Sequence, residues 1–102
     1  MIIKKVDKPA EQNDKSAIYK AMGKMKYPTL AREKNISGKV IARMTIDEFG
    51  QIIDSKITSN THQLLNDEVL RIVKFIPQYQ PAVHQGKNVK VFIDFPLNFQ
   101  VQ

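Results

Sequence analysis

The chain has 102 residues, enough for one domain with one hydrophobic core. Its hydrophobic fraction of 42% and charged fraction of 25% are ordinary for a globular protein, and no apolar run could cross a bilayer. The lack of cysteine excludes disulfides, thiolate metal sites and cysteine nucleophiles. Residues 1–43 carry eleven Lys or Arg and four acidic residues, so the net charge of +6 lies in the first half. This charge indicates an acidic partner, an anionic surface or only a solvated basic face.

Two short helices are predicted in the first third of the chain. Apolar residues recur at three- and four-residue steps from Ser16 to Lys26, which indicates an amphipathic helix with Ser16 as its cap. Pro28 breaks this helix and suits the first turn of a second one, from Thr29 to about Lys34. The polar, lysine-rich residues before Ser16 lack an apolar period, and we interpret them as a tail or an edge extension.

A β-hairpin is predicted after the second helix. Alternate residues are apolar from Lys39 to Asp47, and Ile52 to Ser59 forms the return strand. Gly50 suits the loop between them, because hairpin loops often require a positive φ. Two adjacent isoleucines at the start of the return strand indicate a β-bulge there.

The segment from Leu64 to Ile76 is predicted to be a helix that covers this hairpin. Its apolar side chains form one helical stripe: Leu65, Val69, Ile72, Val73 and Ile76. Pro77 stops the helix, and an extended link between Pro77 and Pro81 leads to a turn at Gly86.

The last strand is predicted from Val89 to Val101, where every odd position is apolar. Because this strand is longer than either hairpin arm, it should leave unpaired backbone groups exposed. Pro96 donates no backbone hydrogen bond, which places it at an edge or a bulge. Together these elements predict an α+β fold: a three-stranded antiparallel sheet with two or three helices packed on one face.

No arrangement of residues predicts catalysis, so we expect a binding module that is not an enzyme. His62 and His84 are isolated, lack the spacing of a helical metal pair, and are interpreted as surface residues. Asp67 and Glu68 are helix neighbours that point apart, which suits compensation of the helix dipole better than a shared proton. No serine lies in a nucleophile elbow. We therefore expect no metal and no cofactor.

The basic charge also raises two other binding roles, at nucleic acid and at a membrane surface. A single-strand nucleic-acid binder needs aromatic residues in a basic groove, and only Phe92, next to Lys90, projects from the polar face of the last strand. Nucleic acid is therefore not the expected partner, and strong salt dependence of binding to DNA or RNA would support it. The lysine-rich helix from Ser16 to Lys26 is short for a membrane-surface helix, which favours a packed helix.

An ordered set of short motifs resembles the TonB C-terminal domain family. The motifs are Tyr27-Pro28, Ile36-Ser37-Gly38-Lys39-Val40, Asp47-Glu48-Phe49-Gly50-Gln51-Ile52, Pro77, Pro81, Gly86-Lys87 and Phe95-Pro96-Leu97-Asn98-Phe99. The stretch from Pro9 to Met25 is similar to the leader of Bacteroidetes-type members. The chain departs from the family at Tyr79, where tryptophan is usual, and at Ala82, where glycine is usual. The resemblance divides the chain into an N-terminal extension with a short helix, residues 1–26, and a TonB C-terminal-like domain, residues 27–102.

The resemblance implies a function for the last strand. Members of this family bind the TonB box, a short segment of outer-membrane transporters, and couple the proton gradient of the inner membrane to active uptake. The box adds as a strand to the last strand, which corresponds here to Val89 to Phe99, and the region before the first helix of the domain also touches it. The implied partner-binding residues in this sequence are Lys26, Tyr27, Pro28, Val89, Lys90, Val91, Phe92, Ile93, Asp94 and Phe95.

The resemblance also implies a location and further partners. Energy transduction needs an N-terminal anchor and a proline-rich arm that reach the inner-membrane proton-channel complex. We therefore expect a periplasmic fragment of an inner-membrane-anchored protein. Strand exchange between two copies, giving a homodimer, is a further expectation from the family. The alternative is a TonB-like protein-interaction or dimerisation module of a membrane sensor or peptidase protein.

Overall fold

The computed structural model of the protein describes residues 5–101, so the remaining residues of the predicted extension and domain lie outside it. Its elements are α1 (Ala17–Met22), α2 (Thr29–Glu33), β1 (Gly38–Ile46), β2 (Ile52–Ile57), α3 (Gln63–Val73), β3 (Ala82–His84), β4 (Lys87–Val89) and β5 (Val91–Phe99). The main sheet is antiparallel with the order β2-β1-β5, and β3 and β4 form a separate antiparallel pair. None of the helices in the described part of the chain is long and apolar enough to span a membrane.

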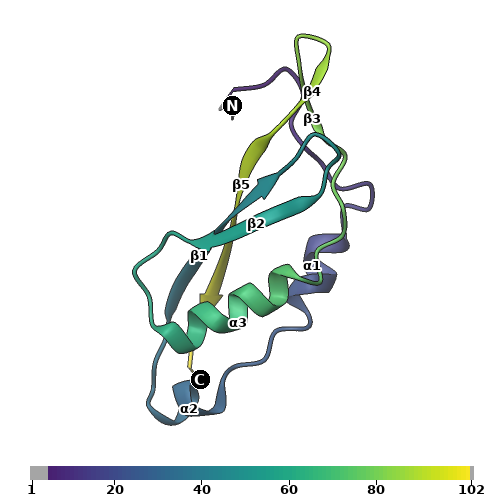
Figure 1. The fold of residues 1–102 in the computed structure, drawn as a ribbon. Helices are drawn as coiled ribbons and strands as arrows, with labels where there is room; N and C mark the ends of the chain where they lie inside the picture. Colours follow the sequence, from purple (N-terminus) through teal and green to yellow (C-terminus); the bar gives the residue numbers. More distant parts are fainter. Residues whose placement is uncertain (1–4, 102) are drawn as a thin grey trace.

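The helices lie on one face of the main sheet. Figure 1 shows α3 lying across this face, with α1 near one end of α3 and α2 near the other. The hairpin of β3 and β4 extends beyond the sheet at the start of β5. The predicted α+β fold, with helices packed on one face of a three-stranded antiparallel sheet, is therefore confirmed.

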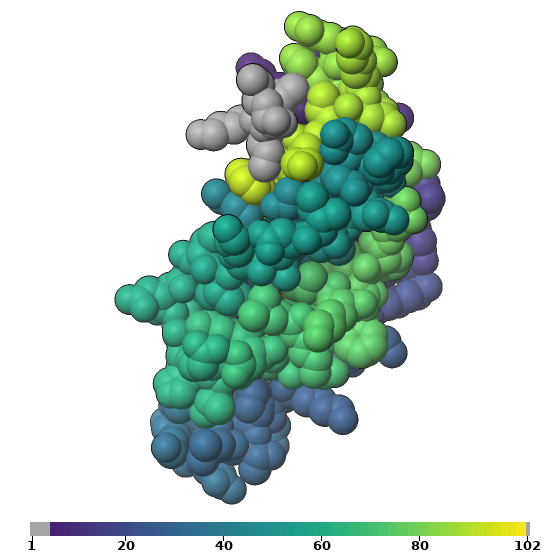
Figure 2. Space-filling view, viewed as in Figure 1, coloured from purple at the N-terminus to yellow at the C-terminus, as the bar shows by residue number. Residues whose placement is uncertain are grey.

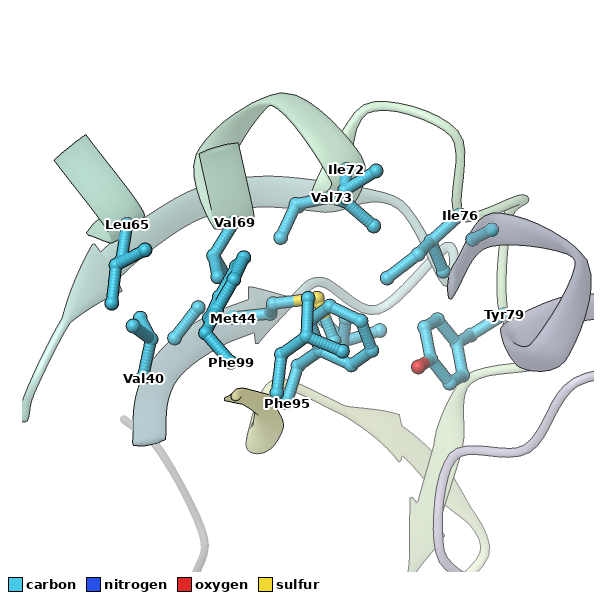
Figure 3. Packing of buried hydrophobic residues seen from close by; sticks show 14 of the residues in the cluster. Val40, Met44, Leu65, Val69, Ile72, Val73, Ile76, Tyr79, Phe95 and Phe99 are labelled. Carbon is cyan, nitrogen blue, oxygen red and sulfur yellow. The ribbon is translucent and has the colours of Figure 1, made fainter. Parts of the chain in front are cut away.

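The hydrophobic core lies between α3 and the sheet (Figure 3). Its main members are Val40, Ala42, Met44 and Ile46 of β1, Leu65, Val69, Ile72 and Val73 of α3, and Val91, Phe95, Leu97 and Phe99 of β5. The predicted apolar stripe of α3 is therefore the buried one. Burying each large aliphatic or aromatic side chain stabilises the fold by about 1.5–3 kcal/mol, so this layer is the main source of stability.

Helix α1 is shorter than predicted and ends at Met22. Gly23 is the C-cap residue, and glycine is disfavoured in a helix by about 1 kcal/mol relative to alanine. The side chain of Ser16 makes no capping bond, contrary to the prediction. Instead, the carboxylate of Asp14 accepts the Ser16 N–H at 2.9 Å and the Ser16 hydroxyl at 2.7 Å. The pKa of Asp14 is lowered to about 2, and the hydrogen bond from the Ser16 hydroxyl makes the largest contribution.

Helix α3 begins at Gln63, one residue earlier than predicted. His62 is its N-cap residue, and the His62 Nδ1 accepts a hydrogen bond from the Leu64 N–H at 3.1 Å. The side chain of His62 is exposed, as predicted, but it has this structural role. The helix ends at Val73, and tighter turns continue the chain to the buried Ile76.

The prediction of one continuous strand from Val89 to Val101 is wrong. Val89 ends β4 and pairs with Ala82 of β3, whereas β5 begins at Val91 and pairs with β1. The predicted link and turn before the last strand are in fact the β3–β4 hairpin, whose turn has positive φ at Gln85 (51°) and Gly86 (77°). The chain changes sheets at Lys90.

The N-terminal segment is an edge extension of this small hairpin. Lys8 and Val83 exchange backbone hydrogen bonds of 2.9 and 2.8 Å. Glu11 and Gln80 do the same at 3.1 and 2.7 Å. His84 was predicted to be a surface residue, but its side chain is only 28% exposed and its Nδ1 lies 3.6 Å from the Asp7 carboxylate. Whether residues 1–26 and 27–102 are separate units stays a prediction.

The β1–β2 turn depends on a close approach to the link after α3. Gly50 has φ of +85°, as the loop prediction required. The Tyr79 N–H donates to the Gly50 carbonyl at 2.8 Å, and a Cβ on Gly50 would overlap the Tyr79 carbonyl. Tyr79 is itself buried, with 8% exposure. The register shifts between Thr45 and Ile46, which confirms the predicted bulge at the start of β2.

Candidate functional site

Strand β5 forms one edge of the main sheet. It pairs with β1 over its whole length, from Val91 opposite Ile46 to Phe99 opposite Gly38. Among residues 5–101, no strand pairs with the other side of β5. This free edge of β5 therefore arises from its position in the sheet, and not from the excess length that the sequence suggested.

The backbone groups on the free edge can be assigned from the pairing of Ile41. The Ile41 carbonyl accepts from the Thr58 N–H at 2.9 Å, and its N–H donates to the Ser59 hydroxyl at 3.0 Å, so both groups point away from β5. Backbone groups alternate in direction along a strand, and Ile41 lies opposite Pro96. The even positions of β5 therefore direct their backbone groups to the free edge, and the odd positions bond to β1.

Four residues consequently supply the free edge: Phe92, Asp94, Pro96 and Asn98. Three of them offer both an N–H and a carbonyl, while Pro96 offers only a carbonyl. The prediction that Pro96 lies at an edge is confirmed, and its missing N–H faces the open side. The free edge thus offers three donors and four acceptors to an added strand.

The side chains of the same residues lie on the face of the sheet opposite the helices. Arg43 forms a bidentate ion pair with Asp94, with Nε–Oδ1 and Nη2–Oδ2 distances of 3.0 and 3.4 Å. The hydrogen bond that Arg43 donates to Asp94 raises the pKa of Arg43. The Arg43 guanidinium also lies 5.2 Å from the ring centre of Phe92, which is 45% exposed. The negative charge on β5 is therefore compensated by its neighbour.

A buried carboxylate holds the segment before α2 in place. Glu68 is 8% exposed, and its carboxylate accepts from the Lys26 N–H at 2.6 Å and from the Arg71 side chain at 2.8 Å. Arg71 also donates to the Lys24 carbonyl at 2.8 Å. The hydrogen bond from Arg71 is the main reason that the pKa of Glu68 is lowered. The interpretation that Glu68 compensates the helix dipole is wrong, since Glu68 lies beyond the first turn of α3 and anchors this segment to the helix.

The anchored segment places Tyr27 at the end of β5. The Tyr27 hydroxyl donates to the Ile36 carbonyl, and the ring packs edge-on against Phe99 with centroids 5.6 Å apart. The Arg32 guanidinium lies 5.6 Å from the Tyr27 ring centre. Tyr27 and Arg32, with Gln100 and Val101 of the segment after β5, line a hollow of about 310 Å³. A strand that continues past the end of β5 would reach this hollow.

The predicted partner-binding residues separate into three groups. Lys26 is exposed, and Tyr27 and Pro28 are partly buried beside the end of β5. Phe92 and Asp94 supply groups to the free edge, whereas Val91, Ile93 and Phe95 direct their backbone groups to β1, with the Val91 and Phe95 side chains buried. Val89 lies in β4, and Lys90 joins the two sheets. Their contact with a partner stays a prediction.

The named partner-binding residues leave out four residues of this site. Pro96 and Asn98 lie within the stretch onto which the resemblance maps the added strand, but they are not among those named residues, although both supply backbone groups to the free edge. Arg32 and Glu68 join the site only through contacts with Tyr27 and Lys26. Within the described residues, no group of three or more His, Asp or Glu side chains is arranged to hold a metal ion.

Comparisons with known proteins agree on one family. Residues 23–101 match the family model described as Gram-negative bacterial TonB protein C-terminal. Two curated relatives, each named Protein TonB and each from a strain of Helicobacter pylori, are 31% identical over 75 residues, or 72% of this chain. The match covers 26% and 27% of those proteins, so the chain spans about a quarter of the curated relatives it matches.

Solved structures show the same fold. An NMR solution structure of the Helicobacter pylori TonB C-terminal domain has a TM-score of 0.64 and 26% identity, covering 84% of this chain and 78% of that one. A shorter form of that domain has a TM-score of 0.57 at 24% identity, covering 81% of this chain and 87% of that one. The similarity to the Bacteroidetes-type leader stays a prediction.

Proposed function

The chain belongs to the family of TonB protein C-terminal domains, and from this premise we propose that it binds the TonB box of outer-membrane transporters as an added strand on the free edge of β5. In the periplasm, such binding would couple the proton gradient of the inner membrane to active uptake. An N-terminal anchor that contacts the proton-channel complex would transmit the force. We expect no catalysis by this domain.

The observation that carries this proposal is the row of backbone groups along β5, from Phe92 to Asn98. An extended peptide gains affinity from main-chain hydrogen bonds to such a row and selectivity from alternate side chains. Each backbone bond contributes about 0.5–1.5 kcal/mol net, so seven bonds supply several kcal/mol before the cost of ordering the peptide. Tyr27 and Lys26 lie where the added strand would pass the end of the sheet.

Strand addition also suits a mechanical role. The bonds of an added strand run perpendicular to the strand direction. A pull along the strands therefore loads all of these bonds together, whereas a pull across them would break the bonds one at a time. The sheet itself is held by the core beneath β1 and β5. The hydrogen bonds between the added peptide and β5 are therefore the weakest connection.

The second candidate is a protein-interaction or dimerisation module of a membrane sensor or peptidase protein. The same free edge of β5 favours it, because an unpaired edge also pairs with a second copy of the chain. The two candidates differ in the partner that occupies the edge.

A titration of the isotope-labelled protein with TonB-box peptides from transporters of its own organism tests the proposal. We expect saturable amide-shift changes at Phe92, Asp94 and Asn98, with smaller changes around Tyr27. Asp54 of β2, on the other edge of the sheet, serves as the internal control and should not respond. If the β5 amides stay unchanged while the protein is monomeric, the transport proposal fails and the interaction module replaces it.

A further inference from the structure

We propose that Pro96, together with the basic residues around both ends of β5, makes the free edge selective for an acidic, extended segment of another protein over a second copy of this chain. The inference rests on the strand-addition function proposed above. It adds the chemical class of the preferred partner and the pairing that the edge disfavours.

The first step concerns the hydrogen bonds available to a foreign strand. In antiparallel pairing, each outward-facing residue exchanges two backbone bonds with the residue opposite it. Phe92, Asp94 and Asn98 can each exchange two such bonds, whereas Pro96 can only accept one. A foreign strand without proline therefore makes one hydrogen bond fewer with this edge than it would if position 96 had an N–H.

Pairing between two copies of the chain loses twice as much. Two β5 edges related by a twofold axis bring two copies of Pro96 into the ladder. If Pro96 lies opposite Asp94, the same defect occurs at both ends of the symmetric pair. If the two Pro96 residues face each other, neither supplies a donor. A register that avoids Pro96 shortens the ladder instead, so every symmetric pairing is weakened.

The charge distribution acts in the same direction. The residues from Lys24 to Lys39, which surround the end of β5, include five Lys or Arg and one acidic residue, Glu33. Lys87 and Lys90 lie before the start of β5, and the charge of Asp94 is compensated by Arg43. Two copies, each with a net charge of +6, repel one another, whereas an acidic segment is attracted at both ends of the edge.

The variant Pro96→Ala tests this inference directly. It adds an N–H that faces the open side and leaves the bonds to β1 intact. Pro9→Ala is the matched control, because it makes the same replacement at an exposed proline outside the main sheet. Self-association is measured by sedimentation velocity, and affinity is measured with an extended peptide of about ten residues that carries acidic side chains. A second peptide has its acidic side chains replaced by amides.

We expect Pro96→Ala to strengthen self-association about 10- to 100-fold and peptide binding about 3- to 10-fold, because self-pairing regains two bonds and peptide pairing regains one. The control should change neither value. The wild-type protein should bind the acidic peptide more tightly than its amide form, and this difference should shrink at high salt.

Three outcomes would overturn the inference. The first is a Pro96→Ala protein that self-associates no more than wild type. The second is self-association that leaves the amides of Phe92, Asp94 and Asn98 unchanged, and the third is equal affinity for the two peptides. If neither protein binds any peptide but Pro96→Ala pairs through β5, the proposed transport function fails and the disfavoured self-pairing stands.

Discussion

The two edges of the main sheet differ in length and regularity. β2 has six residues, a register shift at its start, and an Asp54–Lys56 pair 3.9 Å apart among its side chains. β5 has nine residues that pair with β1 without a shift. In the space-filling view, β2 and α3 lie side by side on the visible face and most of β5 is hidden behind them (Figure 2).

The difference shows how one sheet protects one edge and leaves the other available. Short length, a bulge and charged side chains are the usual means of preventing unwanted strand pairing, and β2 has all three. A hollow of about 560 Å³ separates β2 from the end of α3, and Ser55 and Lys74 are among the residues that line it. β5 has Pro96 and one charged side chain, Asp94, whose charge is paired with Arg43. The comparison predicts that changes near β2 affect folding and changes near β5 affect binding.

The largest expected effect is on the β2 side. Gly50→Ala should lower the free energy of unfolding by more than ~3 kcal/mol, because it combines a strained positive φ with overlap against the Tyr79 carbonyl. Denaturant titration measures the loss. Gly86→Ala is the control: its φ is also positive, at +77°, but nothing lies within 4 Å of the added Cβ. It should lose only about 1–2 kcal/mol. Equal losses would show that the close approach to Tyr79 has no role.

A smaller effect is expected at the anchor near β5. Glu68→Gln should lower the free energy of unfolding by about 1–3 kcal/mol at pH 7, because the Lys26 N–H and the Arg71 side chain lose a charged acceptor. It should also weaken peptide binding by loosening the Lys26–Tyr27 segment. Asp67→Asn is the control, since Asp67 is exposed and accepts only from Gln63 within the described residues. A Glu68→Gln protein as stable as this control would contradict the role of Glu68 as an anchor.

The contribution of Glu68 to stability should depend on pH. The pKa of Glu68 is lowered in the folded protein, mainly by the hydrogen bond from Arg71, relative to its ordinary value of 4.5. Its contribution to stability is therefore fully present above about pH 4.5, and is lost as the pH falls through the folded-state pKa. The stability difference between wild type and Glu68→Gln should shrink over this interval. A constant difference down to strongly acidic pH would contradict this assignment.

The smallest expected effect concerns the hollow at the end of β5. Arg32→Gln should weaken binding of an acidic TonB-box peptide about 2- to 5-fold at low salt, because the guanidinium is exposed and its attraction is screened. Lys56→Gln on β2 removes the same charge from the other edge and should have a smaller effect. Isothermal titration calorimetry distinguishes the two. Equal losses would attribute the attraction to net charge, and the hollow would have no part.

Periodicity in the sequence was sufficient to predict most of the fold. The alternation in β1 and β5 and the stripe of α3 each depend on one buried face, so the pattern of side chains predicts the face directly. Gly50 and Pro96 were also interpreted correctly, because a positive φ and a missing N–H are properties of the residue itself. The resemblance to known motifs pointed to the family, which the comparisons show.

The candidate site was predicted only in part. The alternation continues unchanged through Lys90, because Val89 of β4 and the odd residues of β5 are all apolar. The change of sheet there depends on which strand lies beside each segment, and that is not a local property. For the same reason Asp67 and Glu68 look equivalent in the sequence, although only Glu68 meets Lys26.

Local patterns in the sequence predicted the helices, the main-sheet strands, their buried faces and the backbone roles of Gly50 and Pro96. Long-range contacts were needed to place β5 at an edge with its even residues facing outward, to bury Glu68, and to bring Arg32 next to the Tyr27 ring. The difference comes from the range of the forces involved. Side-chain periodicity and backbone preference act within a few residues, whereas strand pairing and buried ion pairs join segments far apart in the chain, which packing alone brings together.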